Sequence, residues 1–184
     1  MKKHLIATGL MLAVFAGSVI AAEAVKSGPQ VGQKVPGPFE PLNINNGENS
    51  GKKNCLYCQF GQAPVVMVFA REVNPTVTKL IKELDSCTAK NKSADMGSCV
   101  IFCSDAKYLE AKLKNLVEKE KVQNCVLAID NPAGPEDYNI AKDADVTVLV
   151  YKERKVAANF AFKKGEMKDK DVSAVIKAVA KITK

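Results

Sequence analysis

Histidine is almost absent from this chain of 184 residues, and the only one, His4, lies close to the N-terminus. Nucleophilic pairs of the Ser-His and Cys-His type need a histidine to accept a proton. Histidine-containing zinc sites and c-type haem attachment need it as well, and Gln59 stands where a Cys-x-x-Cys-His haem motif requires histidine. Because residues 5–184 contain no histidine, they cannot form any of these three kinds of site.

Several other signatures are missing. The sequence has no glycine-rich phosphate loop, no carboxylate pair spaced for acid–base catalysis and no internal repeat, and Cys-x-x-Cys occurs once. A four-thiolate metal site would need a second such pair. The formal net charge is +7, but the basic residues are scattered and not interleaved with aromatic ones. We therefore expect a mildly basic, solvated surface, with no metal, no cofactor and no nucleic acid bound.

The N-terminus has the pattern of a secretory signal. Lys2 to His4 precede an apolar run from Leu5 to Ala22, and Ala22-Glu23-Ala24 supplies the small residues of a cleavage site. A membrane anchor is the alternative, because the run is close to the length that spans a bilayer. The small residues favour removal of residues 1–24 as a signal peptide. This predicts an exported protein, periplasmic or secreted, without stable membrane insertion.

All six cysteines follow the expected signal, in a compartment where disulfides can form. Cys55 and Cys58 have the spacing of a disulfide, and the same spacing is found in redox-active pairs. Cys87, on the expected buried face of a helix, could bridge Cys99 at the start of the following strand. Cys103 and Cys125 are expected at opposite ends of neighbouring parallel strands, so we predict no bridge between them. Buried apolar thiols are the alternative for all four of these residues.

Strands and helices alternate after residue 38. Continuous apolar or β-branched runs predict buried strands, and charged turns flanked by such runs predict a hairpin. Strands are expected at 39–44, 65–70, 99–103 and 125–129, with a hairpin from 146–151 and 156–162. Helices are expected after the N-cap Asn74, after Ser104 or Asp105, and from Asp169. This order predicts one α/β domain with helices on both faces of a central sheet.

Several segments occur in the order that is found in redoxins. Val31–Phe39 is similar to their opening segment, and Pro64–Phe69 to their central strand. Ile101–Asp105 resembles their strand that ends in Ser-x-Asp, Leu127–Asp130 a later strand that ends in Asp, and Thr147–Tyr151 their terminal hairpin. The chain thus resembles the thioredoxin-like fold in its redoxin and peroxiredoxin (AhpC/TSA-like) branch. The resemblance implies a mixed β-sheet with helices on both faces in a domain at residues 39–184. The glycine-, proline- and lysine-rich composition of residues 25–38 predicts a flexible lead before it.

The chain departs from this family at the usual reactive position. Peroxiredoxins carry their peroxide-attacking cysteine in the first turn after the central strand, and thioredoxins keep Cys-x-x-Cys nearly there. Residues 71–78 of this chain contain no cysteine. Val146 also stands where thioredoxins have a cis-proline before the hairpin strand. The resemblance therefore does not extend to the usual peroxiredoxin mechanism.

Two functions from different classes fit these observations. The first is an exported thiol–disulfide oxidoreductase, in which Cys55 and Cys58 exchange with a thiol or disulfide of a protein partner. A helix N-terminus at the pair would favour the thiolate, and Tyr57 and Phe60 could shield it. The second is a non-catalytic redoxin-like module, held by structural disulfides, that binds a partner. The missing cysteine and the missing cis-proline favour this alternative.

Overall fold

The structure is a computed structural model of the chain, and it describes residues 25–184. The signal peptide expected at residues 1–24 lies outside the described residues. Among residues 25–184, no helix has both the length and the apolar character needed to cross a membrane.

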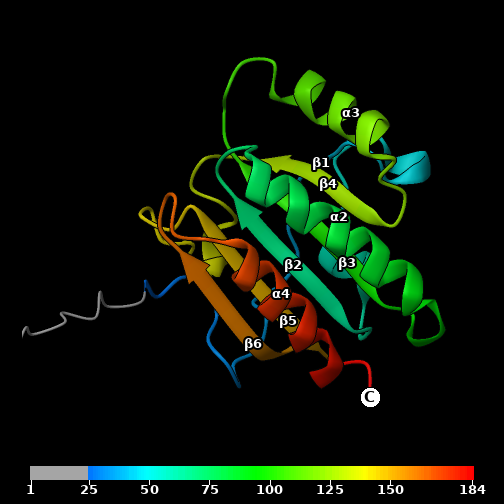
Figure 1. Cartoon of the computed structure of the whole chain (residues 1–184), viewed down its shortest axis with the longest axis vertical. Coiled ribbons are helices and arrows are strands. Elements are labelled where there is room, and N and C mark those ends of the chain that lie inside the picture. Colours follow the sequence, from blue (N-terminus) through cyan, green and yellow to red (C-terminus); the bar gives the residue numbers. More distant parts are fainter. Residues whose placement is uncertain (1–24) are drawn as a thin grey trace, which may run out of the picture.

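A six-stranded mixed sheet forms the centre of the molecule (Figure 1). The strands lie side by side in the order β1-β4-β3-β2-β5-β6. They are β1 (Leu42–Asn43), β2 (Val65–Ala70), β3 (Gly97–Cys103), β4 (Cys125–Asp130), β5 (Val146–Lys152) and β6 (Lys155–Phe162). β2 runs parallel to β3 and β3 parallel to β4, whereas the other pairs are antiparallel. β2 and β3 are buried at every residue, which explains why β2 is apolar throughout and why Ser98 is the one polar side chain in β3.

Helices cover both faces of the sheet, as expected. α2 (Pro75–Lys90), α3 (Leu109–Glu120) and α4 (Asp169–Ala178) pack on one face, where their apolar sides form a first core. The short helix α1 (Leu56–Phe60) packs on the opposite face against a second, smaller core. Single 3-10 turns lie at Gly47–Asn49, Lys92–Ala94, Glu136–Tyr138 and Val179–Lys181. The predicted fold class is therefore confirmed.

The helix starts follow local hydrogen bonding. Asn74 is the N-cap of α2, as predicted, and its Oδ1 accepts the N–H of Val77 at 2.9 Å. The predicted start of the next helix at Ser104 or Asp105 is wrong, because α3 begins at Leu109. The Ser104 hydroxyl accepts the N–H of Ala106 at 3.3 Å instead. This local turn competes with the first turn of a helix and delays it by about one turn.

Residues 25–38, which were expected to form a flexible lead, pack against the domain. The hydroxyls of Ser27 and Thr147 share a buried hydrogen bond of 2.6 Å. Further along, Gly32 N–H donates to the carbonyl of Val156, and Val156 N–H donates to the carbonyl of Gln33, at 2.8 and 2.9 Å. The lead thus adds backbone hydrogen bonds to the start of β6. The folded unit therefore includes residues 25–38.

A carboxylate on α2 fixes the beginning of β4. Asp85 Oδ1 accepts the backbone N–H groups of Gln123, Asn124 and Cys125 at 2.8, 2.5 and 3.0 Å. Partial burial raises the pKa of the Asp85 carboxyl, but these N–H donors outweigh it and leave the pKa below its ordinary value. The ionised side chain therefore stabilises the folded state.

Asp85→Asn should lower the free energy of unfolding at pH 7 by about 1–2 kcal/mol, the lower part of the range for a partly solvated charged acceptor. Because folding lowers this pKa, the wild-type protein loses the contribution as the pH falls through the folded-state pKa. Urea unfolding should therefore show a smaller difference in the free energy of unfolding between the wild-type protein and Asp85→Asn at pH 3 than at pH 7. Asp143→Asn, an exposed carboxylate, is the control. An equal difference at both pH values would contradict this role of the charge.

Candidate redox site

Cys55 and Cys58 form a disulfide at the beginning of α1, as predicted from their spacing. Their Cα atoms are 5.2 Å apart. Cys58 is exposed, whereas Cys55, the N-cap of the helix, is half-buried. A sulfur atom of another molecule can therefore reach Cys58 more directly than Cys55.

The two sulfur atoms also differ in their hydrogen bonding. Cys55 Sγ accepts the backbone N–H of Cys58 at 3.0 Å. A hydrogen bond to the charged form of a group favours that form, so this N–H would stabilise a thiolate on Cys55 after the disulfide opens. The pair is therefore asymmetric in both access and electrostatics.

The side chains of α1 fasten the disulfide to the sheet. Leu56 is completely buried in the second core. The ring of Phe60 lies directly over Gly97, where a Cβ atom would overlap it. On the other side, Gln59 exchanges amide hydrogen bonds with Asn46 and accepts one from Asn54. These contacts hold α1 in place independently of the disulfide.

The other four cysteines, Cys87, Cys99, Cys103 and Cys125, are free and buried. The predicted Cys87–Cys99 bridge is therefore wrong. Cys87 on α2 belongs to the first core, whereas Cys99 belongs to the second core on the opposite face of the sheet. Successive residues of a strand face opposite sides, and it is Ser98 that faces α2. Its hydroxyl shares a 2.6 Å hydrogen bond with that of Thr88.

Burial makes these four thiols poor nucleophiles. It raises the pKa of Cys103 and of Cys125 to about 12. The pKa of Cys99, which is completely buried, is raised well above its ordinary value for the same reason. Since the thiolate is the reactive form, only Cys55 and Cys58 combine access with favourable chemistry.

Arg71 directly follows the carboxyl end of β2, in the segment 71–78 that contains no cysteine. Arg71 donates from its guanidinium to the carbonyls of Pro132, Ala141 and Ala144 at 2.6, 2.9 and 2.9 Å. These bonds tie the segment between β4 and β5 to the end of β2. Residues 25–184 contain no cis peptide bond, so the bond before Val146 is trans. This end of the sheet therefore has a structural role in the part of the chain described.

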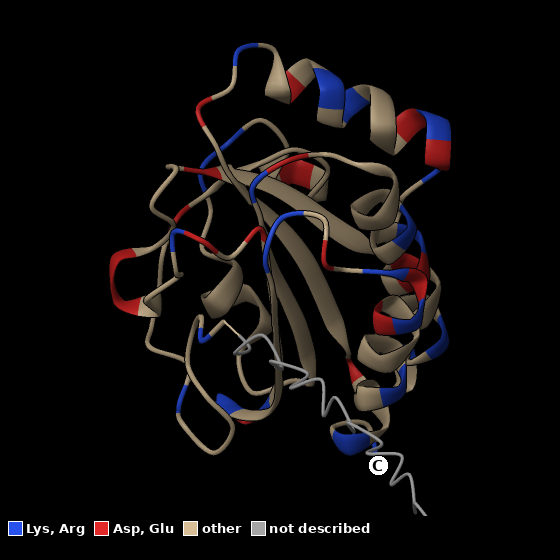
Figure 2. Ribbon diagram, turned by 60° about the vertical axis from the view of Figure 1, so that its left-hand side comes forward, with Lys and Arg blue, Asp and Glu red and all other residues tan. Residues whose placement is uncertain are grey.

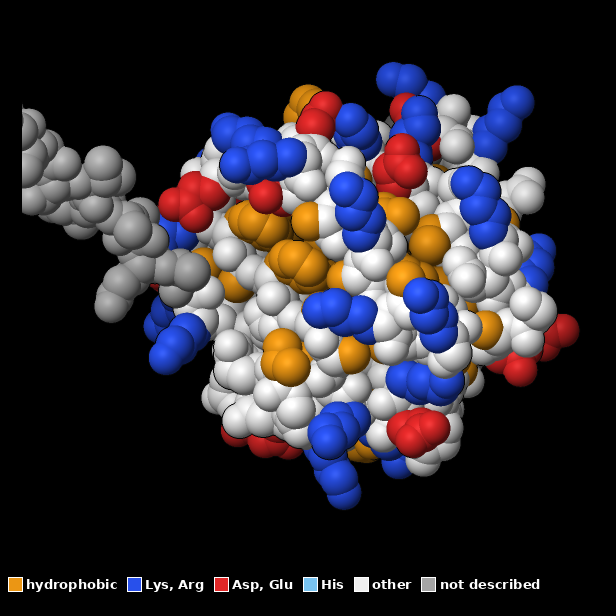
Figure 3. Space-filling view, turned by 60° about the horizontal axis from the view of Figure 1, so that its bottom comes forward, with side chains coloured by type: hydrophobic (Ala, Val, Ile, Leu, Met, Phe, Trp, Pro, Cys, Tyr) orange, Lys and Arg blue, Asp and Glu red, His pale blue; other side chains and the backbone are white. Residues whose placement is uncertain are grey.

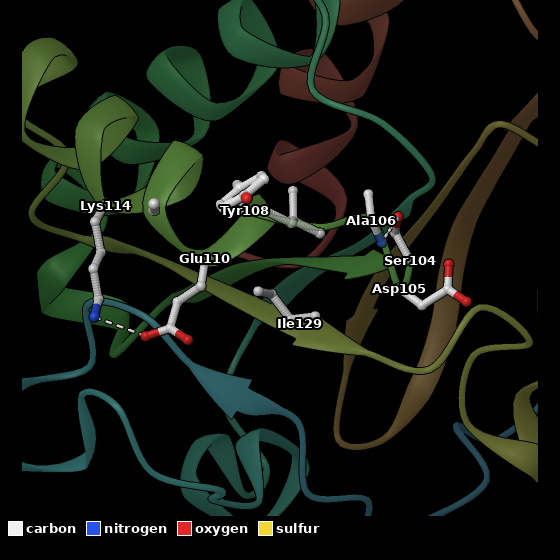
Figure 4. A pocket seen from close by; sticks show the side chains of 9 residues that line it. Ser104, Asp105, Ala106, Tyr108, Glu110, Lys114 and Ile129 are labelled. Atoms are coloured by element: carbon white, nitrogen blue, oxygen red, sulfur yellow. Dashed lines mark hydrogen bonds and ion pairs between the residues drawn. The ribbon is translucent and has the colours of Figure 1, made fainter.

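A shallow hollow of about 480 Å³ lies at the same end of the sheet, between β4, α3 and the segment that joins β3 to α3 (Figure 4). Asp105 and Ile129 line it, and Tyr108 beside it is 84% exposed. Glu110 and Lys114 form an ion pair of 2.7 Å along α3 at its edge. None of its lining residues is a cysteine. The hollow thus offers no thiol chemistry.

Charged side chains are spread over the surface. They lie mainly on helices and loops (Figure 2), and on the face seen in Figure 3 the lysines and arginines are separated by neutral, hydrophobic and acidic side chains. Within residues 25–184, no three histidine, cysteine or carboxylate side chains come together as a metal site.

Several solved structures have a fold similar to that of this chain. A protein assigned as a disulfide isomerase from Bacteroides thetaiotaomicron has 14% identity and a TM-score of 0.64, over 86% of this chain and 94% of its own. The peroxidoxin BcpB from Mycobacterium tuberculosis has 16% identity and a TM-score of 0.58, over 86% and 99%. A secreted M. tuberculosis disulfide oxidoreductase, homologous to E. coli DsbE, has 15% identity and a TM-score of 0.51, over 76% and 95%. The fold is thioredoxin-like.

The thioredoxin-like fold confirms the resemblance found in the sequence. No protein-family model matches the chain, and no curated protein sequence matches it. Identities this low show the fold alone. The chemistry must therefore be argued from the site, where the disulfide lies before β2 rather than after it.

Selective thiol labelling tests the environment of the cysteines. After mild reduction of the native protein, iodoacetamide should label Cys55 and Cys58 only, because the other four thiols are buried. Labelling in denaturant should reach all six cysteines of the chain. Peptide mass spectrometry counts the labelled sites in each sample. A Cys87–Cys99 disulfide in unreduced protein would contradict the structure.

The contact beneath α1 can be tested by a double-mutant cycle. Gly97→Ala should lower the free energy of unfolding by about 1–3 kcal/mol, because the new methyl group overlaps the Phe60 ring. In a Phe60→Leu background the same alanine should lower the free energy of unfolding by clearly less. Gly37→Ala is the control, since nothing lies within 4 Å of a Cβ there. Urea unfolding measures all the variants, and additive effects would contradict the contact.

Proposed function

We propose that this protein is an exported thiol–disulfide oxidoreductase that uses Cys55 and Cys58 as its redox pair, with protein thiols or disulfides as substrates. The observation that carries the proposal is the asymmetric disulfide, which exposes Cys58 while Cys55 accepts an N–H bond. The thioredoxin-like fold supports it, as do two similar proteins, one assigned as a disulfide isomerase and the other a secreted disulfide oxidoreductase. The secreted neighbour and the signal-like N-terminus support export.

In the oxidising direction, a substrate thiolate attacks Cys58 Sγ. A sulfur–sulfur bond forms between substrate and Cys58, the Cys55–Cys58 bond breaks, and its electron pair leaves on Cys55 Sγ. The N–H of Cys58, 3.0 Å from this sulfur, stabilises the leaving thiolate. A second substrate thiolate then attacks the substrate sulfur of the mixed disulfide and releases Cys58. The substrate loses two electrons, and Cys55 and Cys58 become a dithiol.

In the reducing direction the same steps run backwards. The thiolate of Cys58 attacks a substrate disulfide, and Cys55 then attacks Cys58 Sγ to release the reduced substrate. Cys58 is thus the residue that carries the mixed disulfide in both directions, because it is the more exposed of the two.

A purely structural disulfide is the competing explanation, and energetics argue against it. The bridge encloses only Leu56 and Tyr57, so its entropic contribution is below the ~3 kcal/mol of a longer loop. Leu56, Phe60 and the Gln59 amide network already fix α1. The fold therefore does not depend on this bridge.

Single serine variants test the roles of the two cysteines. Cys55→Ser should accumulate a mixed disulfide at Cys58, because the resolving thiol is gone. It should react with Ellman's reagent about tenfold faster than Cys58→Ser, whose remaining thiol is half-buried and less accessible. Absorbance gives the rates, and peptide mass spectrometry locates the adduct. Insulin reduction by the wild-type protein, absent in both variants, would show turnover.

The structural alternative makes the opposite prediction. If the disulfide resists mild reductant in the native protein and both serine variants unfold, as seen by circular dichroism, the redox function is wrong. The double variant Cys55→Ser/Cys58→Ser should instead keep the wild-type spectrum and show no exchange.

A further inference from the structure

Arg154 is stacked on Tyr57, one of the two residues enclosed by the disulfide, and makes no side-chain hydrogen bond among residues 25–184. Its guanidinium carbon is 4.5 Å from the ring centroid of Tyr57, which directly precedes Cys58. Arginine has five N–H donors. Within residues 25–184, no carboxylate forms an ion pair with Arg154, and its buried Nε has no hydrogen-bond partner. Arg71, by contrast, donates to three carbonyls.

The hairpin turn between β5 and β6 sets the position of Arg154. Glu153 and Arg154 have φ angles of 52° and 61°, the left-handed region that such turns usually fill with asparagine and glycine. Glu153 N–H donates to the carbonyl of Gln62, just after α1, at 3.1 Å, and the Arg154 carbonyl accepts the N–H of Val35 at 2.8 Å. The backbone therefore holds the guanidinium near α1 without using its donors.

A second polar group without a partner lies on the same hairpin. Tyr151 is 1% exposed, and its hydroxyl is buried without a hydrogen-bond partner. Burial raises the pKa of this phenol, with smaller contributions from Cys99, Tyr138 and Tyr57, so Tyr151 is a neutral donor. The Tyr151 hydroxyl is enclosed, whereas the guanidinium of Arg154, stacked on Tyr57, belongs to a partly exposed side chain and has no acidic partner in the described part of the chain. Such a group is complementary to an anion.

We propose that Arg154, stacked on Tyr57, forms a carboxylate-binding subsite that selects thiols and disulfides with an acidic group near the reacting sulfur. The inference rests on the proposed function of Cys55 and Cys58. A guanidinium matches a carboxylate with two parallel hydrogen bonds, and stacking on an aromatic ring leaves its N–H edge available. Because Tyr57 and Cys58 are adjacent, a substrate held at Arg154 has its neighbouring sulfur close to the exposed sulfur of Cys58.

Two small thiols that differ in charge can test the subsite. We compare the opening of the Cys55–Cys58 disulfide by 3-mercaptopropionate and by 2-mercaptoethanol, at equal thiolate concentration and low salt. Relative to Arg154→Gln, the wild-type protein should favour the carboxylate thiol by about fivefold, in the range of an accessible arginine–carboxylate pair. The preference is the rate with 3-mercaptopropionate divided by the rate with 2-mercaptoethanol. Comparing this ratio between the wild-type protein and Arg154→Gln cancels the intrinsic reactivities of the two thiols. Added salt should reduce the preference.

Two further variants separate geometry from charge. Lys155→Gln, which removes an exposed charge from the same hairpin, should keep the preference of the wild-type protein. Arg154→Lys keeps the charge but loses the planar fork, so the preference should fall to an intermediate value. For 2-mercaptoethanol, whose thiolate carries no carboxylate, Lys155→Gln should react within about twofold of the wild-type rate.

The possible outcomes distinguish the two proposals. If the wild-type protein shows no preference, or if Lys155→Gln loses it as completely as Arg154→Gln, the subsite is wrong, while reaction with 2-mercaptoethanol still supports the redox pair. If neither thiol opens the disulfide in the folded protein, both proposals are wrong. A preference present in the wild-type protein and in Lys155→Gln, and lost in Arg154→Gln, supports the subsite.

Discussion

The alternation of side chains along β3 determines the environment of Cys99 and Cys103 on this strand and of Cys87 on α2. Ser98 faces α2, whereas Cys99 faces the second core, so the thiol of Cys87 has no sulfur opposite it. One residue earlier, Gly97 leaves room for the ring of Phe60 and lets α1 pack on the sheet. Because the period of a strand is two residues, a shift of one position would reverse all of these contacts.

The two ends of the central strands have separate roles. At the carboxyl end of β2, Arg71 directs its guanidinium into three backbone carbonyls and stabilises the connection between β4 and β5. Before the start of β2, the disulfide lies at the beginning of α1, and Arg154 stacks on Tyr57 of the same helix without a hydrogen-bond partner for its Nε. Two arginines in one chain therefore illustrate the difference between a satisfied structural cation and a cation available to a ligand. The position that thioredoxins and peroxiredoxins use for cysteine has become part of the scaffold here.

Local signals in the sequence predicted much of this fold. The apolar run of β2, the Asn74-Pro75 start of α2 and the Cys55–Cys58 spacing each depend on neighbouring residues, and each was found as expected. The start of α3 was missed because of a local turn at Ser104, and the other errors concern contacts between distant residues. β3 begins at Gly97 rather than at Cys99. The hydrophobic pattern does not predict this earlier start, so the sequence does not reveal that Ser98 is the residue that faces α2. The packing of residues 25–38 against the domain depends on hydrogen bonds to residues more than 100 positions away, such as the bond between Ser27 and Thr147.

Arg154 shows why a site of this kind is hard to find from sequence. It lies in a charged turn, Lys152 to Lys155, which has the composition of any solvated hairpin. Its significance comes from the fold, which places β5 next to β2 and so brings the turn beside the residues that precede β2. Thiol–disulfide exchange needs an accessible sulfur, a stabilised leaving thiolate and a way to hold the substrate. Cys58, the Cys58 N–H group and Arg154 would supply these three at the entrance of β2, so the proposed exchange does not require a cysteine at the other end of the strand.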